Sequence, residues 1–160
     1  MKKLILIIIF ALNIMANIDF KETNIIAAIP DYEKVQYGSM DFSDDLIILS
    51  YTKPNLQTIT YDKEKVSINT NEEIKEYYFE QYPKIEFIGL ITKALITNSF
   101  ETLDELFIKT IEQGDTILSA KPILRNVIDY IKIQYTKENK VNIITIYMEN
   151  EDIRTIEIIH

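Results

Sequence analysis

The side chains of this sequence best suited to catalysis or metal binding are carboxylates that lie in short runs. These runs are Asp44-Asp45, Glu72-Glu73 and the group Glu149, Glu151 and Asp152. Two converging carboxylates can act as general acid and general base, and oxygen ligands at regular spacing around a glycine can bind calcium or magnesium. Each run lies where the pattern predicts a turn, and none has the spacing or the glycine of a metal-binding loop. A hydrolase that uses carboxylates is therefore only an alternative, since no convergent set supports it.

Nucleophilic catalysis lacks its usual partners in this chain. There is no cysteine, which excludes a thiol nucleophile, a thiolate metal site and a disulfide. The only histidine is His160, the final residue of the sequence, so Ser67, Ser99 and Ser119 have no internal histidine to activate them. Three glycines are too few for a phosphate-binding loop. We expect a protein that is not an enzyme, with no catalytic residue, no metal ligand and no cofactor.

Length, composition and charge favour one acidic, β-rich domain. A chain of 160 residues with 47% hydrophobic residues can bury one real core but not two. Isoleucine dominates the apolar residues, and ten tyrosines accompany it. Branched and aromatic side chains fit the pleated surface of a strand. The formal net charge of -8 argues against a nucleic-acid partner, because phosphate binding needs clustered lysine and arginine.

Residues 1–16 are typical of a secretory signal peptide. Lys2 and Lys3 precede the apolar run Leu4 to Leu12, which is too short to cross a bilayer, and Asn13 to Ala16 follow it. We expect cleavage near Ala16 and a periplasmic location, with an uncleaved anchor as the alternative. The predicted organisation is a signal peptide over 1–16 and a single domain over 17–160, which we expect to be a monomer.

Alternation of apolar and polar residues, interrupted by charged turns, predicts a meander of antiparallel strands. The expected strands are Ile18–Ile29, Val35–Phe42, Leu46–Thr52, Leu56–Tyr61, Val66–Asn69, Phe107–Glu112, Thr116–Ala120, Tyr130–Thr136, Val141–Met148 and Ile153–Ile159. Val35, Tyr37, Met40 and Phe42 compete for the inner face around Gly38, a glycine that indicates a bulge or bend. Residues 123–128 suit either a short helix or a strand.

One segment departs from this pattern and has helical periodicity. Over Pro83 to Thr97, one line along the helix carries Ile88, Ile91 and Leu95, and beside it lie Phe87, Leu90 and Ala94. The opposite side is a polar strip of Glu86, Gly89, Lys93 and Thr97. Pro83 suits a first helical turn. A helix with so wide an apolar face must be largely covered, and a short second helix is expected over Glu101–Leu106. The predicted fold class is mainly β with a helical lid, an α+β arrangement.

The apolar faces of two expected strands allow two interpretations. Ile47, Leu49 and Tyr51 share one face of their strand, and Ile131, Ile133 and Tyr135 share one face of another. One helix over such a sheet either fills the space as a solid core or leaves a hollow for an apolar ligand. Periodicity alone favours the solid core, which leaves an exported interaction module as an alternative function.

The order of several weak motifs resembles the LolA-type periplasmic carriers of outer-membrane lipoproteins, especially the divergent LolA-like branch. The motifs are the signal peptide, Phe20-x-Glu22, Gly38 before an apolar strand, Leu49-x-Tyr51-x-x-Pro54, a return strand ending at Asp62, the proline-led helix, Phe107 opening a strand, Thr116 to Pro122, and a final pair of strands with Arg154-Thr155-x-Glu157-Ile158. The resemblance covers nearly all of the chain after residue 16.

The resemblance implies a half-open antiparallel β-barrel with one apolar helix packed over its concave face, which shelters acyl chains of lipoproteins or lipids. It implies transfer from an inner-membrane exporter to an outer-membrane acceptor, and it assigns the ligand-binding residues. Ile47, Leu49 and Tyr51 would face the cavity, Ile59 would line the neighbouring strand, and Ile88, Ile91 and Leu95 would form the lid.

Two features depart from the family pattern. The acidic turn Ser43-Asp44-Asp45 replaces a basic Lys-Arg-Pro turn whose arginine holds the lid shut, and the N-terminal helix before the first strand is missing. These departures favour a cargo other than mature lipoproteins, such as a free lipid or glycolipid.

Overall fold

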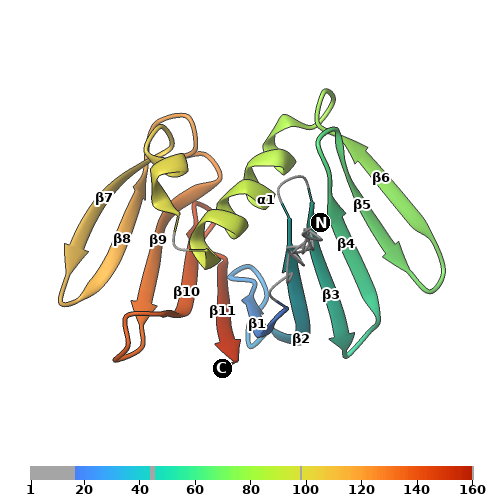
Figure 1. Ribbon diagram of the computed structural model, residues 1–160, viewed down its shortest axis with the longest axis horizontal. Helices are drawn as coiled ribbons and strands as arrows, with labels where there is room; N and C mark the ends of the chain where they lie inside the picture. The colour runs from blue at the N-terminus through green and yellow to red at the C-terminus, as the bar shows by residue number, and fades with distance from the viewer. Residues whose placement is uncertain (1–16, 44–45, 98, 160) are drawn as a thin grey trace, which may run out of the picture.

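The computed structural model (Figure 1) describes residues 17–43, 46–97 and 99–159, and these form one sheet of antiparallel strands beside one α-helix. The strands are β1 (Ile18–Ile25), β2 (Glu33–Phe42), β3 (Ile47–Lys53), β4 (Gln57–Tyr61), β5 (Lys65–Thr70), β6 (Ile74–Tyr78), β7 (Phe107–Glu112), β8 (Asp115–Ala120), β9 (Ile128–Tyr135), β10 (Val141–Met148) and β11 (Ile153–Ile159). The helix α1 (Pro83–Ile96) and the 3-10 helix η1 (Phe100–Leu103) lie between β6 and β7 in the chain. The signal peptide predicted over residues 1–16 lies outside the described residues.

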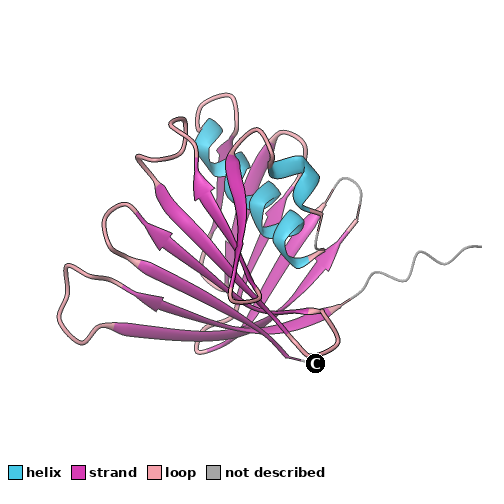
Figure 2. Cartoon of the chain, turned by 90° about the vertical axis from the view of Figure 1, so that its left-hand side faces the viewer, coloured by secondary structure: helices cyan, strands magenta, loops and turns pink. Residues whose placement is uncertain are grey.

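The sheet is open, and strands that follow one another in sequence pair with one another, except β6 and β7. The strand order is β6-β5-β4-β3-β2-β1-β11-β10-β9-β8-β7, so the first and last strands pair with each other in the middle. β6 and β7 are the two edges. Figure 2 shows the curved sheet with α1 lying against one of its faces, which we call the concave face. The predicted fold class is confirmed.

The expected alternation within strands is also confirmed. On β3, Ile47, Leu49 and Tyr51 are buried, while Ile48 and Ser50 between them are half-buried. On β9, Ile131 and Ile133 are fully buried. These side chains belong to one hydrophobic core, which α1 closes with Ile91, Ala94 and Leu95.

Gly38 marks the irregularity that its place inside a strand predicted. The register between β2 and β3 shifts between Tyr37 and Gly38. A Cβ atom at Gly38 would lie 2.4 Å from the carbonyl oxygen of Ser50, so the two strands approach too closely there for any side chain. Plain alternation along β2, which pairs with β1 without a shift, puts Met40 and Phe42 on the inner face. Met40 is buried, whereas Tyr37 points to solvent with 40% of its surface exposed.

Several expected boundaries are wrong, and the errors lie where apolar alternation is absent or misleading. The first strand ends at Ile25 rather than Ile29, and a turn with Asp31 at a positive φ of 56° follows. Strand β6 was not expected, because it is an edge strand whose side chains are mostly exposed and carry no alternating pattern. Residues 123–127 form turns, and the second helix is only the 3-10 turn η1.

The helix has the predicted start and nearly the predicted end, but its polar strip is not all exposed. Pro83 occupies the first turn, where its missing N–H needs no partner. Thr92, which lies outside the predicted strip, is buried, and its hydroxyl is satisfied by donating to the carbonyl oxygen of Ile88 at 2.8 Å. Gly89 is buried against the sheet, while Leu90 is 49% exposed. Among the described residues, no helix is long and apolar enough to span a membrane.

Candidate functional site

The candidate site is the concave face of the sheet, where cross-strand partners extend the apolar surface beyond the helix. Leu49 on β3 opposes Ile59 on β4, which opposes Ile68 on β5. The next row runs Ile47, Tyr61, Val66 and Tyr77 across β3 to β6. Directly paired residues of antiparallel strands point to the same face, so both rows line the concave side.

The structure brings most of the predicted ligand-binding residues into one cluster. Ile47, Leu49 and Tyr51 of β3 and Ile91 and Leu95 of α1 are all buried in the hydrophobic core. Ile59 is half-buried and packs against that core. Ile88 is half-buried and is not part of the cluster formed by the described residues. The five buried side chains fill the space below the helix, so their role as ligand contacts stays a prediction.

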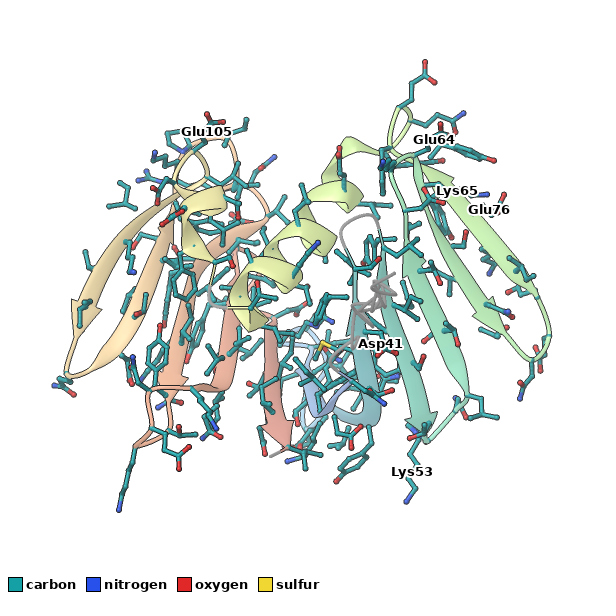
Figure 3. The ribbon with its side chains drawn as sticks, viewed as in Figure 1. Asp41, Lys53, Glu64, Lys65, Glu76 and Glu105 are labelled. Atoms are coloured by element: carbon teal, nitrogen blue, oxygen red, sulfur yellow. The ribbon has the colours of Figure 1, made fainter. Side chains whose placement is uncertain are left out.

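The strands β4, β5 and β6 form an arm that the helix leaves partly uncovered. Figure 1 shows these strands extending away from α1 at one side of the molecule. On the concave side of this arm, Ile59, Tyr61, Ile68 and Tyr77 are all only half-buried. The opposite face is polar and carries an ion pair between Lys65 and Glu76, which lie side by side in Figure 3. The arm therefore has one apolar, accessible face and one solvated face.

A cleft of about 290 Å³ lies beside the contact between α1 and this arm. Its walls include Ile47 and Tyr61 from the sheet and Gly89 and Lys93 from the helix. Lys93 Nζ donates to the carbonyl oxygen of Ser43 at 2.8 Å, which ties the helix to the β2–β3 turn. A second, more apolar cleft of about 450 Å³ lies between α1 and η1 and is lined by Ala94, Leu103 and their neighbours.

A buried polar cluster lies on the same face at the centre of the sheet. Glu22 of β1 is 4% exposed, and its Oε2 accepts hydrogen bonds from Arg154 Nη2 at 2.7 Å and from the Tyr51 hydroxyl at 2.8 Å. Its Oε1 accepts from Asn24 Nδ2 at 2.7 Å. Arg154 lies on β11 directly opposite Asn24 of β1, and this pairing places its guanidinium within reach of Glu22. The partners of this carboxylate therefore come from β1, β3 and β11.

The electrostatics of this cluster follow from its burial and its one cation. Burial raises the pKa of the Glu22 carboxyl, but the charge of Arg154 and its hydrogen bond, together with those from Asn24 and Tyr51, more than offset this, so the pKa lies below its usual value. Burial and the neighbouring carboxylate raise the pKa of Tyr51, which stays a hydrogen-bond donor. Glu22 is thus held as a carboxylate that neutralises Arg154.

Sequence reasoning included Glu22 and Arg154 only as motif residues and gave them no structural role. Both occupy inward positions of strands, next to buried Phe20 and Ile156 in the alternation. An acid and an arginine at inward positions of two strands indicate a pair, but their contact spans 132 residues and depends on the pairing of the chain's outer strands. Among the described residues, no group of three or more acidic or histidine side chains could hold a metal ion.

Comparison with known proteins gives a match only to solved structures. No protein family model matches the sequence, and no curated protein matches it. One solved structure with a similar arrangement is the crystal structure of the LolA superfamily protein NE2245 from Nitrosomonas europaea. The match has a TM-score of 0.41 and 7% sequence identity, and it covers 90% of this chain and 83% of that chain.

Proposed function

We propose that this protein is a periplasmic carrier that binds acyl chains of lipids or lipoproteins on its concave face and moves them toward the outer membrane. The observation that carries the proposal is the uncovered concave face of the β4–β6 arm. Its half-buried apolar side chains, including Ile59 and Ile68, continue directly into the core below α1. An acyl chain laid along this surface would gain about 0.8 kcal/mol for each buried methylene group.

The helix is the natural cover for such a ligand. It contacts the sheet on both sides of the centre, at β5 and at β10, and it borders the cleft beside Tyr61. A chain that enters the cleft would have to displace α1 side chains such as Ile91 to reach Leu49, since both are now buried. The donor and acceptor in this scheme are an inner-membrane exporter and an outer-membrane acceptor.

The test is purification of the protein from its periplasm, followed by extraction and mass spectrometry of bound lipid. We expect a stoichiometric acyl-containing ligand. The variant Ile68→Asn places an amide on the concave face of β5 and should reduce the bound lipid several-fold, because burying an amide against an acyl chain is costly. The matched control is Ser67→Asn, which changes the neighbouring residue on the opposite face and should leave the bound lipid unchanged.

The packed core favours one second candidate, an exported interaction module without a ligand cavity. In that case neither the purified protein nor a fluorescent fatty-acid probe would show binding, and Ile68→Asn and Ser67→Asn would behave alike. Replacing Leu49 with aspartate does not separate the two functions, because Leu49 is 3% exposed in the core and a buried carboxylate would unfold either protein.

A further inference from the structure

A separate cavity of about 370 Å³ lies at the end of the sheet that carries the β1–β2 turn. It is lined by Asn24, Tyr32, Lys34, Met148 and Arg154, together with three isoleucines and Asp152. This is the opposite end of β2 from the β2–β3 turn, where Lys93 anchors the helix. The cavity is therefore distinct from the cleft beside α1.

Two cations flank an amide in one row across the floor of this cavity. Lys34 of β2 opposes Asn24 of β1, and Asn24 opposes Arg154 of β11. Opposed residues share a face, so all three side chains emerge on the concave side. Two strand spacings separate the cations, about 10 Å between their backbones, a gap that a lysine and an arginine can close around a single anion.

Both cationic side chains have donors to spare. Nε of Arg154 is buried and has no hydrogen-bond partner among the described residues, although Nη2 is bound to Glu22. Leaving a buried donor without a partner costs free energy, and a hydrogen bond to a ligand oxygen would recover it. Lys34 is exposed and forms no hydrogen bond or ion pair with the described part of the chain.

The carboxylates nearby do not compete for these donors. Asp152 binds its own turn and the next one, since its Oδ1 accepts from the backbone N–H of Ala27 at 3.0 Å and its Oδ2 from Asn150 Nδ2 at 2.8 Å. Both oxygens of Glu22 are also occupied. Since Glu22 neutralises Arg154, Lys34 is the cation on this wall without an ion-pair partner among the described residues, and Nε of Arg154 adds one unused hydrogen-bond donor.

We propose that this cavity binds the carboxylate or phosphate group of an anionic amphiphile between Lys34, Asn24 and Arg154. The apolar remainder of the cavity decides between an amphiphile and a free ion. Ile25 and Tyr32 at its rim are 42% and 36% exposed, and an alkyl chain attached to the anionic group would cover them. The proposal rests on the proposed carrier function and names the headgroup class of its ligand.

The experiment compares three probes by titration calorimetry: decyl phosphate, decanol and inorganic phosphate, each below its aggregation limit. We expect decyl phosphate to bind more tightly than decanol, and inorganic phosphate to bind more weakly than either. Lys34→Gln should weaken decyl phosphate roughly fivefold and leave decanol unchanged, because only the anion uses the lysine. The charge-matched control is Lys21→Gln, which removes a lysine from the opposite face of β1 and should change neither probe.

Each contrary result overturns a defined part of the scheme. Equal binding of decyl phosphate to the wild type and to Lys34→Gln removes the anion site and leaves the carrier function standing. Inorganic phosphate binding as tightly as decyl phosphate identifies a free-ion site and removes the headgroup assignment. If neither decyl phosphate nor decanol binds, the carrier function fails together with the headgroup. Because Lys34 is exposed, its variant keeps the fold, which a thermal melt verifies.

Discussion

At the scale of single residues, the ion pair between Glu22 and Arg154 is the most consequential contact. Their side chains are 6% and 18% exposed, so neither charge is well solvated. Removing one partner of a buried pair leaves the other charge uncompensated, which typically costs about 3–5 kcal/mol. We therefore expect Glu22→Gln to lower the free energy of unfolding by roughly that amount in urea titrations.

The control for this prediction is the neighbouring pair on the opposite face of β1. Lys21 and Glu157 are 31% and 42% exposed, and such pairs contribute about 0–1 kcal/mol. Lys21→Gln should therefore cost little. If Glu22→Gln and Lys21→Gln lowered the free energy of unfolding equally, the buried pair would contribute no more to stability than the exposed one.

The same carboxylate predicts a pH dependence with a definite sign. The folded pKa of Glu22 lies below its ordinary value of 4.5, so its contribution to stability is complete above pH 4.5 and is lost as the pH falls through the folded pKa. The difference in unfolding free energy between the wild type and Glu22→Gln should shrink as the pH falls below about 4.5, because a protonated Glu22 resembles glutamine. Chemical unfolding at a series of pH values measures this difference. A constant difference down to pH 2 would contradict the prediction.

At the scale of elements, the contact between α1 and β4 depends on a glycine. A Cβ atom added at Gly89 would lie 2.6 Å from Cδ1 of the Tyr61 ring, so either the ring or the helix would have to shift. Gly89→Ala should lower the free energy of unfolding by about 1–3 kcal/mol, although alanine is the better helix former. The exposed neighbour Leu90 supplies a control, since Leu90→Ala should change the free energy of unfolding by less than about 0.5 kcal/mol.

A double-mutant cycle separates the two effects of alanine at position 89. In a Tyr61→Ala background the clash is gone, and Gly89→Ala should stabilise the protein by about 0.5–1 kcal/mol through helix propensity alone. If Gly89→Ala is destabilising in both backgrounds, Tyr61 is not the residue that requires the glycine.

The elements that could be predicted are those with a strong local pattern. Pro83 and the apolar spacing after it are sufficient to predict the helix, and β10 and β11 have the predicted bounds because alternation continues to their ends. The need for glycine at position 89 was not predictable, because it arises from a ring on β4 that only the folded sheet brings near. The edge strand β6 was not predicted because its side chains are mostly exposed, so its sequence has no alternation of apolar and polar residues.

At the scale of the whole molecule, the candidate site depends on pairings between distant parts of the chain. The inward faces of β3 and β9 were predictable from alternation, and so was the helix that covers them. Which part of the concave face stays uncovered was not predictable, because it depends on where α1 lies relative to β4, β5 and β6. The polar row across β2, β1 and β11 likewise exists only because the outer strands of the sequence meet at the centre of the sheet.

That central pairing predicts that the two halves of the sheet unfold together. Ile156 on β11 is 1% exposed at the seam between them, so Ile156→Ala should cost about 2–5 kcal/mol. In native-state hydrogen exchange, the free energy of exchange of the slowest amides should fall by the same amount in β3 on one side and in β9 on the other. The reason is that neither half of the sheet stays folded once the contacts at the β1–β11 seam are weakened. The matched control is Ile74→Ala on the edge strand β6, where the side chain is 66% exposed and only nearby amides should respond. Loss of protection confined to β7–β11 in the Ile156 variant would mean that the two halves of the sheet unfold independently.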